Sequence, residues 1–203
     1  MSFCLKVTAI AILPAIALVS QGGISGTKHD LSTRGWGSTE LCVFCHTPHN
    51  GDKTVSEAPL WNHKVTTAAF TVYSSPTMNT VAGQPGASSK LCLSCHDGTV
   101  AMDSFSGANG THSLTGTNML GTDLANDHPI SIVYDATLAG NDGGLVTPVS
   151  ASKVDAAGTI RLFAAKMECA SCHDVHSNVN APFLRVANTG SALCLKCHIK
   201  YGL

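Results

Sequence analysis

Four copies of the pattern Cys-x-x-Cys-His divide this 203-residue chain and constrain its fold more than any other feature. The four motifs occupy residues 42–46, 92–96, 169–173 and 194–198, and are numbered 1 to 4 in that order. The pattern is the attachment signature of c-type haem: both cysteines form thioethers and the histidine becomes an axial ligand of the iron. Histidine accounts for only 10 of the 203 residues, so its presence after all four cysteine pairs is not a coincidence.

The motif residues are therefore predicted to hold four haem c groups. The eight predicted attachment residues are Cys42, Cys45, Cys92, Cys95, Cys169, Cys172, Cys194 and Cys197. The four predicted proximal ligands are His46, His96, His173 and His198. Structural zinc and disulfides are alternatives for paired cysteines, but neither explains a histidine after every pair. The ninth cysteine, Cys4, lies in the N-terminal segment, apart from the motifs.

The second axial position on each iron is expected to be filled by histidine as well. Two candidates follow a proximal histidine by three residues, a spacing that places both rings on one face of a helix. Such a ring cannot reach the opposite side of the same haem, so it is predicted to ligate a neighbouring haem. The full set of distal candidates is His29, His49, His63, His128 and His176, whereas His112 is expected at the surface. With five candidates for four irons, one is spare or binds a haem of another subunit.

Composition predicts a small, haem-dominated fold that is mostly coil, with short helices around the motifs and a few short strands. Aromatic residues make up only 5% of the chain, and glycine is abundant. Such a chain has little material for an ordinary core, so the porphyrins are expected to supply much of the buried apolar surface, and the chain is predicted not to fold without them. Strands are expected at residues 69–73, 130–134 and 159–163.

The N-terminal segment and the motif spacing define the expected organisation. Residues 1–22 are predicted to be a signal peptide cleaved between Ser20 and Thr27, because their apolar run is too short for a membrane span. Residues 23–203 are expected to form a single tetrahaem domain, with haems 1 and 2 in residues 27–105 and haems 3 and 4 in 166–203. Residues 106–165 form an insertion without an attachment site. Motifs 3 and 4 start only 25 residues apart, so their haems are predicted to be near neighbours.

The sequences around the motifs resemble the cytochrome family with doubled C-x-x-C-H motifs. The resemblance lies in residues 28–32 and 42–50, in residues 91–101 and in residues 126–131. Within that family the chain is most similar to extracellular tetrahaem cytochromes of metal-reducing bacteria, which polymerise into conducting filaments. The resemblance implies bis-histidine haems, export to the cell exterior or outer-membrane surface, and a homopolymer in which one axial histidine comes from the adjacent subunit. His29 is the favoured trans ligand, because an N-terminal arm can reach across.

The expected function is electron transfer, without catalytic residues, from upstream redox partners to extracellular metal oxides or electrodes. A monomeric periplasmic shuttle is the first alternative. A multihaem nitrite-type reductase is less favoured, since the distal candidates outnumber the irons. No nucleic-acid partner is expected, because the formal net charge is −1 and basic clusters are missing from the sequence.

Overall fold

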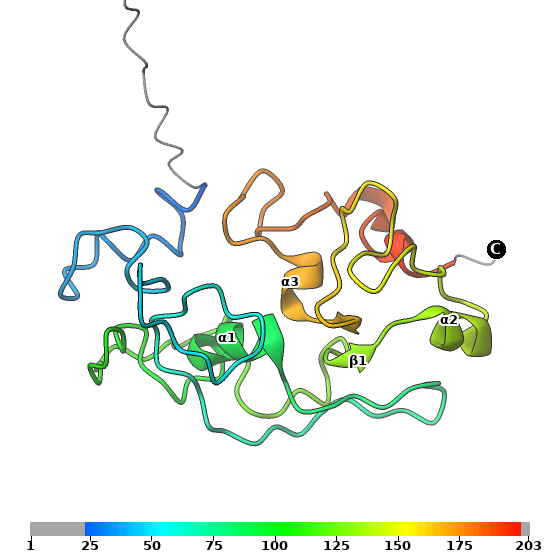
Figure 1. The fold of residues 1–203 in the computed structure, drawn as a ribbon, viewed down its shortest axis with the longest axis horizontal. Coiled ribbons are helices and arrows are strands. Elements are labelled where there is room, and N and C mark those ends of the chain that lie inside the picture. The colour runs from blue at the N-terminus through cyan, green and yellow to red at the C-terminus, as the bar shows by residue number, and fades with distance from the viewer. Residues whose placement is uncertain (1–22, 200–203) are drawn as a thin grey trace, which may run out of the picture.

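The computed structural model describes residues 23–199, and turns and irregular segments dominate it (Figure 1). The regular elements are α1 (Ala87–His96), β1 (Ile132–Val133), α2 (Ala136–Asp142), β2 (Lys166–Met167), α3 (Cys169–Cys172) and the 3-10 turns η1 (Thr189–Ser191) and η2 (Cys194–Lys196). The prediction of a coil-rich fold with short helices is confirmed. The predicted signal peptide lies outside the described residues. Of the helices within residues 23–199, none has the length and hydrophobicity of a membrane span.

The strand predictions are only partly correct. Strand β1 lies inside the expected segment 130–134 and pairs antiparallel with β2, which was not expected. Residues 69–73 and 159–163 form isolated bridges only, so these two predictions are wrong. For residues 69–73 the reason is visible at Phe70, whose N–H and C=O both bond to the side-chain amide of Gln84. A side chain thus occupies the backbone groups that a neighbouring strand would use.

Helix α3 lies between the two ends of the molecule (Figure 1). Helix α1 and the N-terminal segment lie on one side of it, and α2 and the C-terminal segment lie on the other. Helix α1 contacts α3 directly, and the N–H of Cys169 donates to Ser89 Oγ at 2.8 Å. Motifs 2 and 3 are therefore held next to each other near the middle of the fold.

The main apolar core belongs largely to the segment without haem attachment sites. Its buried members are Ala82, Ile132, Tyr134, Leu138, Val154, Ile160, Leu162 and Met167. A smaller cluster consists of Phe70, Leu93 and Leu124. The predicted insertion is thus more than a connection, because it supplies most of the ordinary core against which the C-terminal motif packs.

Candidate haem-binding sites

Each motif forms a single helical turn. The N–H of the motif histidine donates to the C=O of the first motif cysteine in motifs 1, 3 and 4, at 2.8, 3.0 and 2.9 Å. Motif 2 forms the last turn of α1. One turn of helix projects two cysteines and one histidine from a short piece of backbone. The expectation of helical structure around each motif therefore agrees with the geometry.

Three proximal histidines are oriented by a hydrogen bond from Nδ1 to a backbone carbonyl. The pairs are His46 with Pro59 (2.7 Å), His96 with Asn118 (2.8 Å) and His173 with Pro182 (3.1 Å). Such a bond fixes the proton on Nδ1, orients the ring and leaves Nε2 as the metal-binding nitrogen. The distal candidate His128 is held in the same way by the carbonyl of Pro129, at 3.0 Å.

The structure brings predicted proximal and distal histidines together as pairs. Ring centroids are 6.0 Å apart for His29 and His96, 6.1 Å for His46 and His176, and 6.4 Å for His128 and His198. Each pair joins one motif histidine to one candidate from a different part of the chain. His176, from the motif 3 segment, lies beside His46, the predicted proximal histidine of motif 1.

These separations fit a metal held between two imidazoles. A metal–nitrogen bond is about 2 Å long and the ring centre lies about 1 Å beyond the nitrogen, so two axial rings have centres about 6 Å apart. All three observed pairs match this value. A ring nitrogen of His29, Nδ1, is also buried without a hydrogen-bond partner within residues 23–199. The donor set therefore fits haem iron at three of the four motifs.

Motif 3 differs from the others. Among the described residues, His173 forms no comparable pair with another histidine ring. Two candidates remain unpaired, His49 and His63. His49 is exposed and contacts Asn50 through its Nδ1 at 3.3 Å. Within residues 23–199, one predicted iron and two distal candidates are thus left without a partner.

His63 lies beside an attachment residue, and its ring faces the backbone on both sides. The residue is 3% exposed, and its two ring nitrogens face the carbonyl oxygens of Lys64 (2.8 Å) and Ala101 (3.0 Å). Its Nε2 is 3.6 Å from the sulfur of Cys95. Burial lowers the pKa of His63, although the two carbonyls oppose this effect. A neutral imidazole can donate to only one of these carbonyls, but both nitrogens point at the backbone, and His63 pairs with no motif histidine within residues 23–199. This geometry does not support His63 as a distal ligand.

His29 lies close to a predicted proximal histidine of its own chain. Its ring lies against His96 of the same chain and contacts Phe183 edge to face at 4.8 Å. Burial lowers the pKa of His29, and the neighbouring His96 and His173 lower it further. The sequence favours His29 as the ligand of an adjacent subunit, and that role stays a prediction. The structure places its ring 6.0 Å from the ring of His96 in the same chain.

Neighbouring motif sulfurs lie close together in chain order. Contact with Cys169 and burial raise the pKa of Cys92. Burial and the nearby sulfur of Cys45 raise the pKa of Cys95 to about 12. The attachment residues of motif 2 therefore lie near those of motifs 1 and 3.

The same holds at the C-terminal end. Burial raises the pKa of Cys172, and the sulfurs of Cys169 and Cys194 raise it further. The sulfurs of Cys172 and Cys194 therefore lie near each other, and the closeness of haems 3 and 4 stays a prediction.

Two buried polar residues that the sequence did not single out support motifs 3 and 4. Glu168, 1% exposed, begins α3: its carboxylate accepts hydrogen bonds from Ser131, and Ser171 Oγ accepts one from its N–H. Burial raises the pKa of Glu168. The hydroxyl of Tyr134 donates to the carbonyl of Cys197 at 3.2 Å. Glutamate is not among the residues preferred at a helix N-cap, so the sequence carried no clear signal for this cap.

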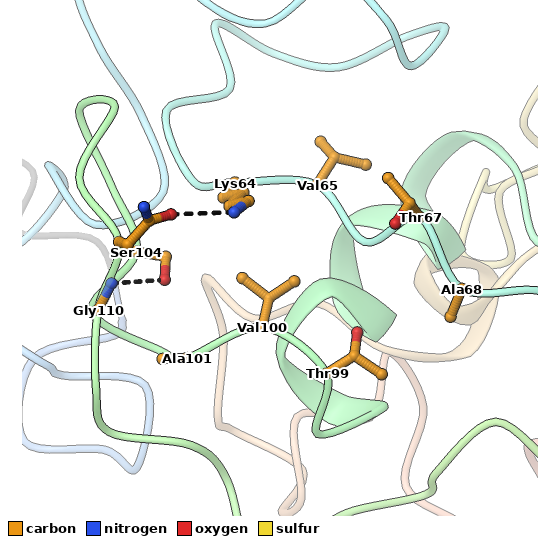
Figure 2. A pocket seen from close by; sticks show the side chains of 10 residues that line it. Lys64, Val65, Thr67, Ala68, Thr99, Val100, Ala101, Ser104 and Gly110 are labelled. Carbon is orange, nitrogen blue, oxygen red and sulfur yellow. Dashed lines mark hydrogen bonds between the residues drawn. The ribbon is translucent and has the colours of Figure 1, made fainter.

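The described residues also form an open cavity of about 370 Å³ beside the segment that follows motif 2 (Figure 2). Its lining includes Val65, Thr67 and Val100, and at one end Lys64 donates to Asn109 Oδ1 at 2.9 Å. None of the predicted haem ligands lines it. The cavity is therefore distinct from the spaces between the histidine pairs.

Comparison with known proteins supports the cofactor assignment for the C-terminal part. Residues 163–202, which contain motifs 3 and 4, match the family described as the doubled CXXCH motif. No curated protein matches the chain. The family match and the motif pattern together support haem c binding of the kind found in multihaem c-type cytochromes, proteins that carry electrons.

Proposed function

We propose that the chain is a tetrahaem c-type cytochrome whose function is electron transfer and not catalysis. The observation that carries this proposal is the set of three histidine pairs, each about 6 Å apart and each containing a motif histidine. Two protein ligands per iron leave no coordination position for a substrate. When bound, the haems supply the one-electron redox chemistry.

The protein's own groups account for the remaining requirements of electron transfer. Nδ1 hydrogen bonds to backbone carbonyls hold His46 and His96 in a fixed orientation, so a change in iron charge need not move the ligand. The adjoining attachment residues Cys92 and Cys169 bring successive haems close together. A fixed, closely spaced series of saturated irons is suited to passing electrons along the chain.

We further propose that the chain is exported and assembles into an extracellular homopolymer that delivers electrons to metal oxides or electrodes. The support is the resemblance to the filament-forming tetrahaem cytochrome OmcE, together with two histidines that find no partner ring among the described residues. His49 is exposed, and His173 has no ring partner among the described residues. His49 of an adjacent subunit, in place of His29, is the ligand we assign to the iron of His173.

Haem content tests the first proposal. Mass spectrometry of the mature protein should give the polypeptide plus four haems. Low-temperature EPR of the oxidised, assembled protein should then give low-spin signals only. A permanent high-spin signal from one haem, with nitrite bound there, would favour the reductase.

Histidine variants separate the ligand assignments. His128→Ala should convert one haem to high spin, whereas the matched control His63→Ala should leave all haems low spin. His49→Ala should convert one haem and also abolish filaments in negative-stain micrographs. Uniform small particles from the unaltered protein at high concentration would favour the periplasmic shuttle over the filament.

A further inference from the structure

The N-terminal arm, residues 23–37, brings His29 to His96 without any helix or strand of its own. At its start, the N–H of Gly23 donates to the carbonyl of His176 at 3.0 Å. Near its end, the ring of Trp36 stacks on the ring of His112, with centroids 4.6 Å apart and planes 20° apart. The described part of the arm is therefore fastened at two points, with His29 between them.

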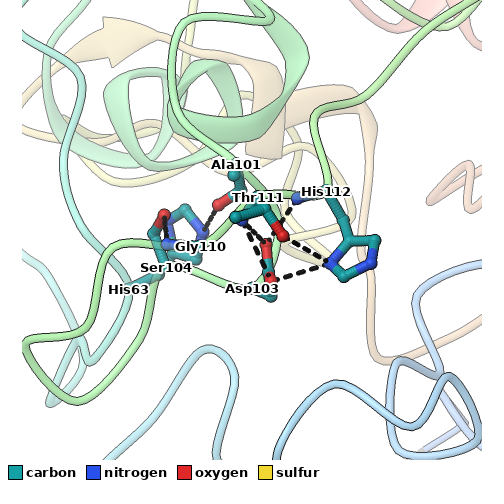
Figure 3. A network of polar contacts seen from close by, with 7 residues as sticks. All are labelled: His63, Ala101, Asp103, Ser104, Gly110, Thr111 and His112. Atoms are coloured by element: carbon teal, nitrogen blue, oxygen red, sulfur yellow. Dashed lines mark hydrogen bonds and ion pairs between the residues drawn. The ribbon is translucent and has the colours of Figure 1, made fainter.

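The histidine under Trp36 is itself held firmly (Figure 3). Asp103 accepts a hydrogen bond from His112 Nδ1 at 2.8 Å and others from the backbone N–H groups of Thr111 and His112. Burial would raise the pKa of Asp103, but these hydrogen bonds lower it to about 2. The carboxylate is therefore ionised at neutral pH and fixes both the ring and the backbone of residues 111–112.

The loop that carries these groups follows motif 2 directly. Asp103 and His112 lie seven and sixteen residues after His96, and the N–H of Met102 donates to the carbonyl of His112 at 2.9 Å. The stacking surface for Trp36 is thus built on the same segment that presents the proximal ligand. A contact with this loop places the arm relative to the iron of motif 2.

We infer that Asp103, His112 and Trp36 form a clamp that keeps His29 in the axial position opposite His96. These three are positioning residues, because they act through the arm and do not touch the iron. The inference rests on the proposed function, since it requires that His29 and His96 share a haem. Without the clamp, the arm retains the hydrogen bond of Gly23 to His176, the turn around Asp30 and the edge contact of His29 with Phe183.

The expected size of the effect follows from the stacking contact. Aromatic pairs of this kind contribute up to about tenfold in an equilibrium constant. Loss of the clamp should therefore raise the fraction of time that His29 is off the iron by up to about tenfold. The arm remains covalently joined to motif 1 through residues 38–41, so complete loss of ligation is not expected.

Carbon monoxide binding to the reduced holoprotein measures this fraction, because the gas binds only a ferrous haem whose distal ligand has left. His112→Ala and Trp36→Ala should each increase the rate of CO binding at one haem in four by up to about tenfold. Trp36→Phe keeps an aromatic ring and should restore most of the original rate. Thr115→Ala, an exposed change in the segment that follows the loop, is the matched control.

Limited trypsin digestion gives a second readout that does not depend on the haem. Cleavage after Lys28 and Arg34, both in the arm, should be faster in His112→Ala than in Thr115→Ala. His112 has about half of its side chain exposed (49%), so its removal should leave the rest of the fold intact.

His29→Ala distinguishes the possible failures. If it opens one haem to CO but His112→Ala and Trp36→Ala do not, the clamp is wrong and the ligand assignment stands. If His29→Ala opens no haem, the pairing of His29 with His96 is wrong, and the clamp is overturned with it.

Discussion

Two regions of this chain are stabilised in different ways. Residues 130–167 bury their own apolar side chains against one another: Val154 and Ile160 are each 1% exposed, and Tyr134 is 2% exposed. The motif segments instead present histidine rings to one another across about 6 Å, and the histidines of motifs 3 and 4 are exposed. The first region contains its own core, whereas the second is organised around positions where a cofactor fits.

The difference shows that two kinds of interaction stabilise different parts of this chain. A few buried aliphatic and aromatic side chains are enough to hold a small segment, at roughly 25 cal/mol per Å² of apolar surface removed from water. The motif segments have few such residues, and each iron would join two distant parts of the chain. Their order should therefore depend on haem far more than the order of residues 130–167 does.

The largest expected effect comes from preventing haem attachment. Protein in which all eight motif cysteines are replaced by serine should lack the native circular dichroism spectrum. Any amide protection that persists in hydrogen exchange should map to residues 130–167. The physical reason is that the histidine pairs lose the metal that joins them, whereas the apolar cluster does not contain a motif residue among its fully buried members.

Equal protection in the motif segments and in residues 130–167 of that variant would contradict the comparison. The fully attached holoprotein is the control, since it should be protected in both regions.

A cavity in the ordinary core should have the next largest effect. Leu162 is 5% exposed within the main cluster, and removal of a buried leucine side chain costs about 2–5 kcal/mol. Leu162→Ala should therefore lower the free energy of unfolding by that amount in chemical denaturation. Val149→Ala, which truncates a side chain that is 54% exposed in the same segment, should change it by less than about 0.5 kcal/mol. A similar loss in both variants would mean that the cluster is not the stabilising core.

Glu168 makes the junction between the two regions sensitive to pH. Its folded-state pKa is raised by burial, so the folded protein holds this proton more tightly than the unfolded chain. The contribution to stability is therefore complete below the ordinary glutamate pKa and is lost as pH rises through the raised value. Glu168→Gln should remove this decline, with a difference on the order of 1 kcal/mol at neutral pH.

Urea denaturation at several pH values measures that difference. Glu40→Gln, at an exposed position, is the control. If the free energy of unfolding changes with pH in the same way in the unaltered protein and in Glu168→Gln, burial does not raise the pKa of Glu168.

The sequence predicts the motifs better than it predicts the structure around them. The motif residues and the set of distal histidines were predictable, because haem attachment depends on a local pattern. The partner of each histidine was not predictable, because His63 and His29 differ only in what the folded chain places around them. Two backbone carbonyls occupy the nitrogens of His63. The core of residues 130–167 was missed because its buried members are separated along the chain by small and polar residues, chiefly alanine, glycine, serine and threonine.

The smallest expected effect concerns the link between the two regions at motif 4. The Tyr134 hydroxyl donates to the carbonyls of Val146 (2.8 Å) and Cys197 (3.2 Å), and the N–H of Val146 donates to Cys197 (2.7 Å). Tyr134→Phe keeps the buried ring and removes only the hydroxyl, so it should cost about 1 kcal/mol. Because the loss falls at the junction, the Val146 amide should exchange faster with solvent than amides inside the cluster. Tyr73→Phe is the matched control, since its hydroxyl bonds to none of the described residues, and an equal effect from both would show that motif 4 is held by its haem alone.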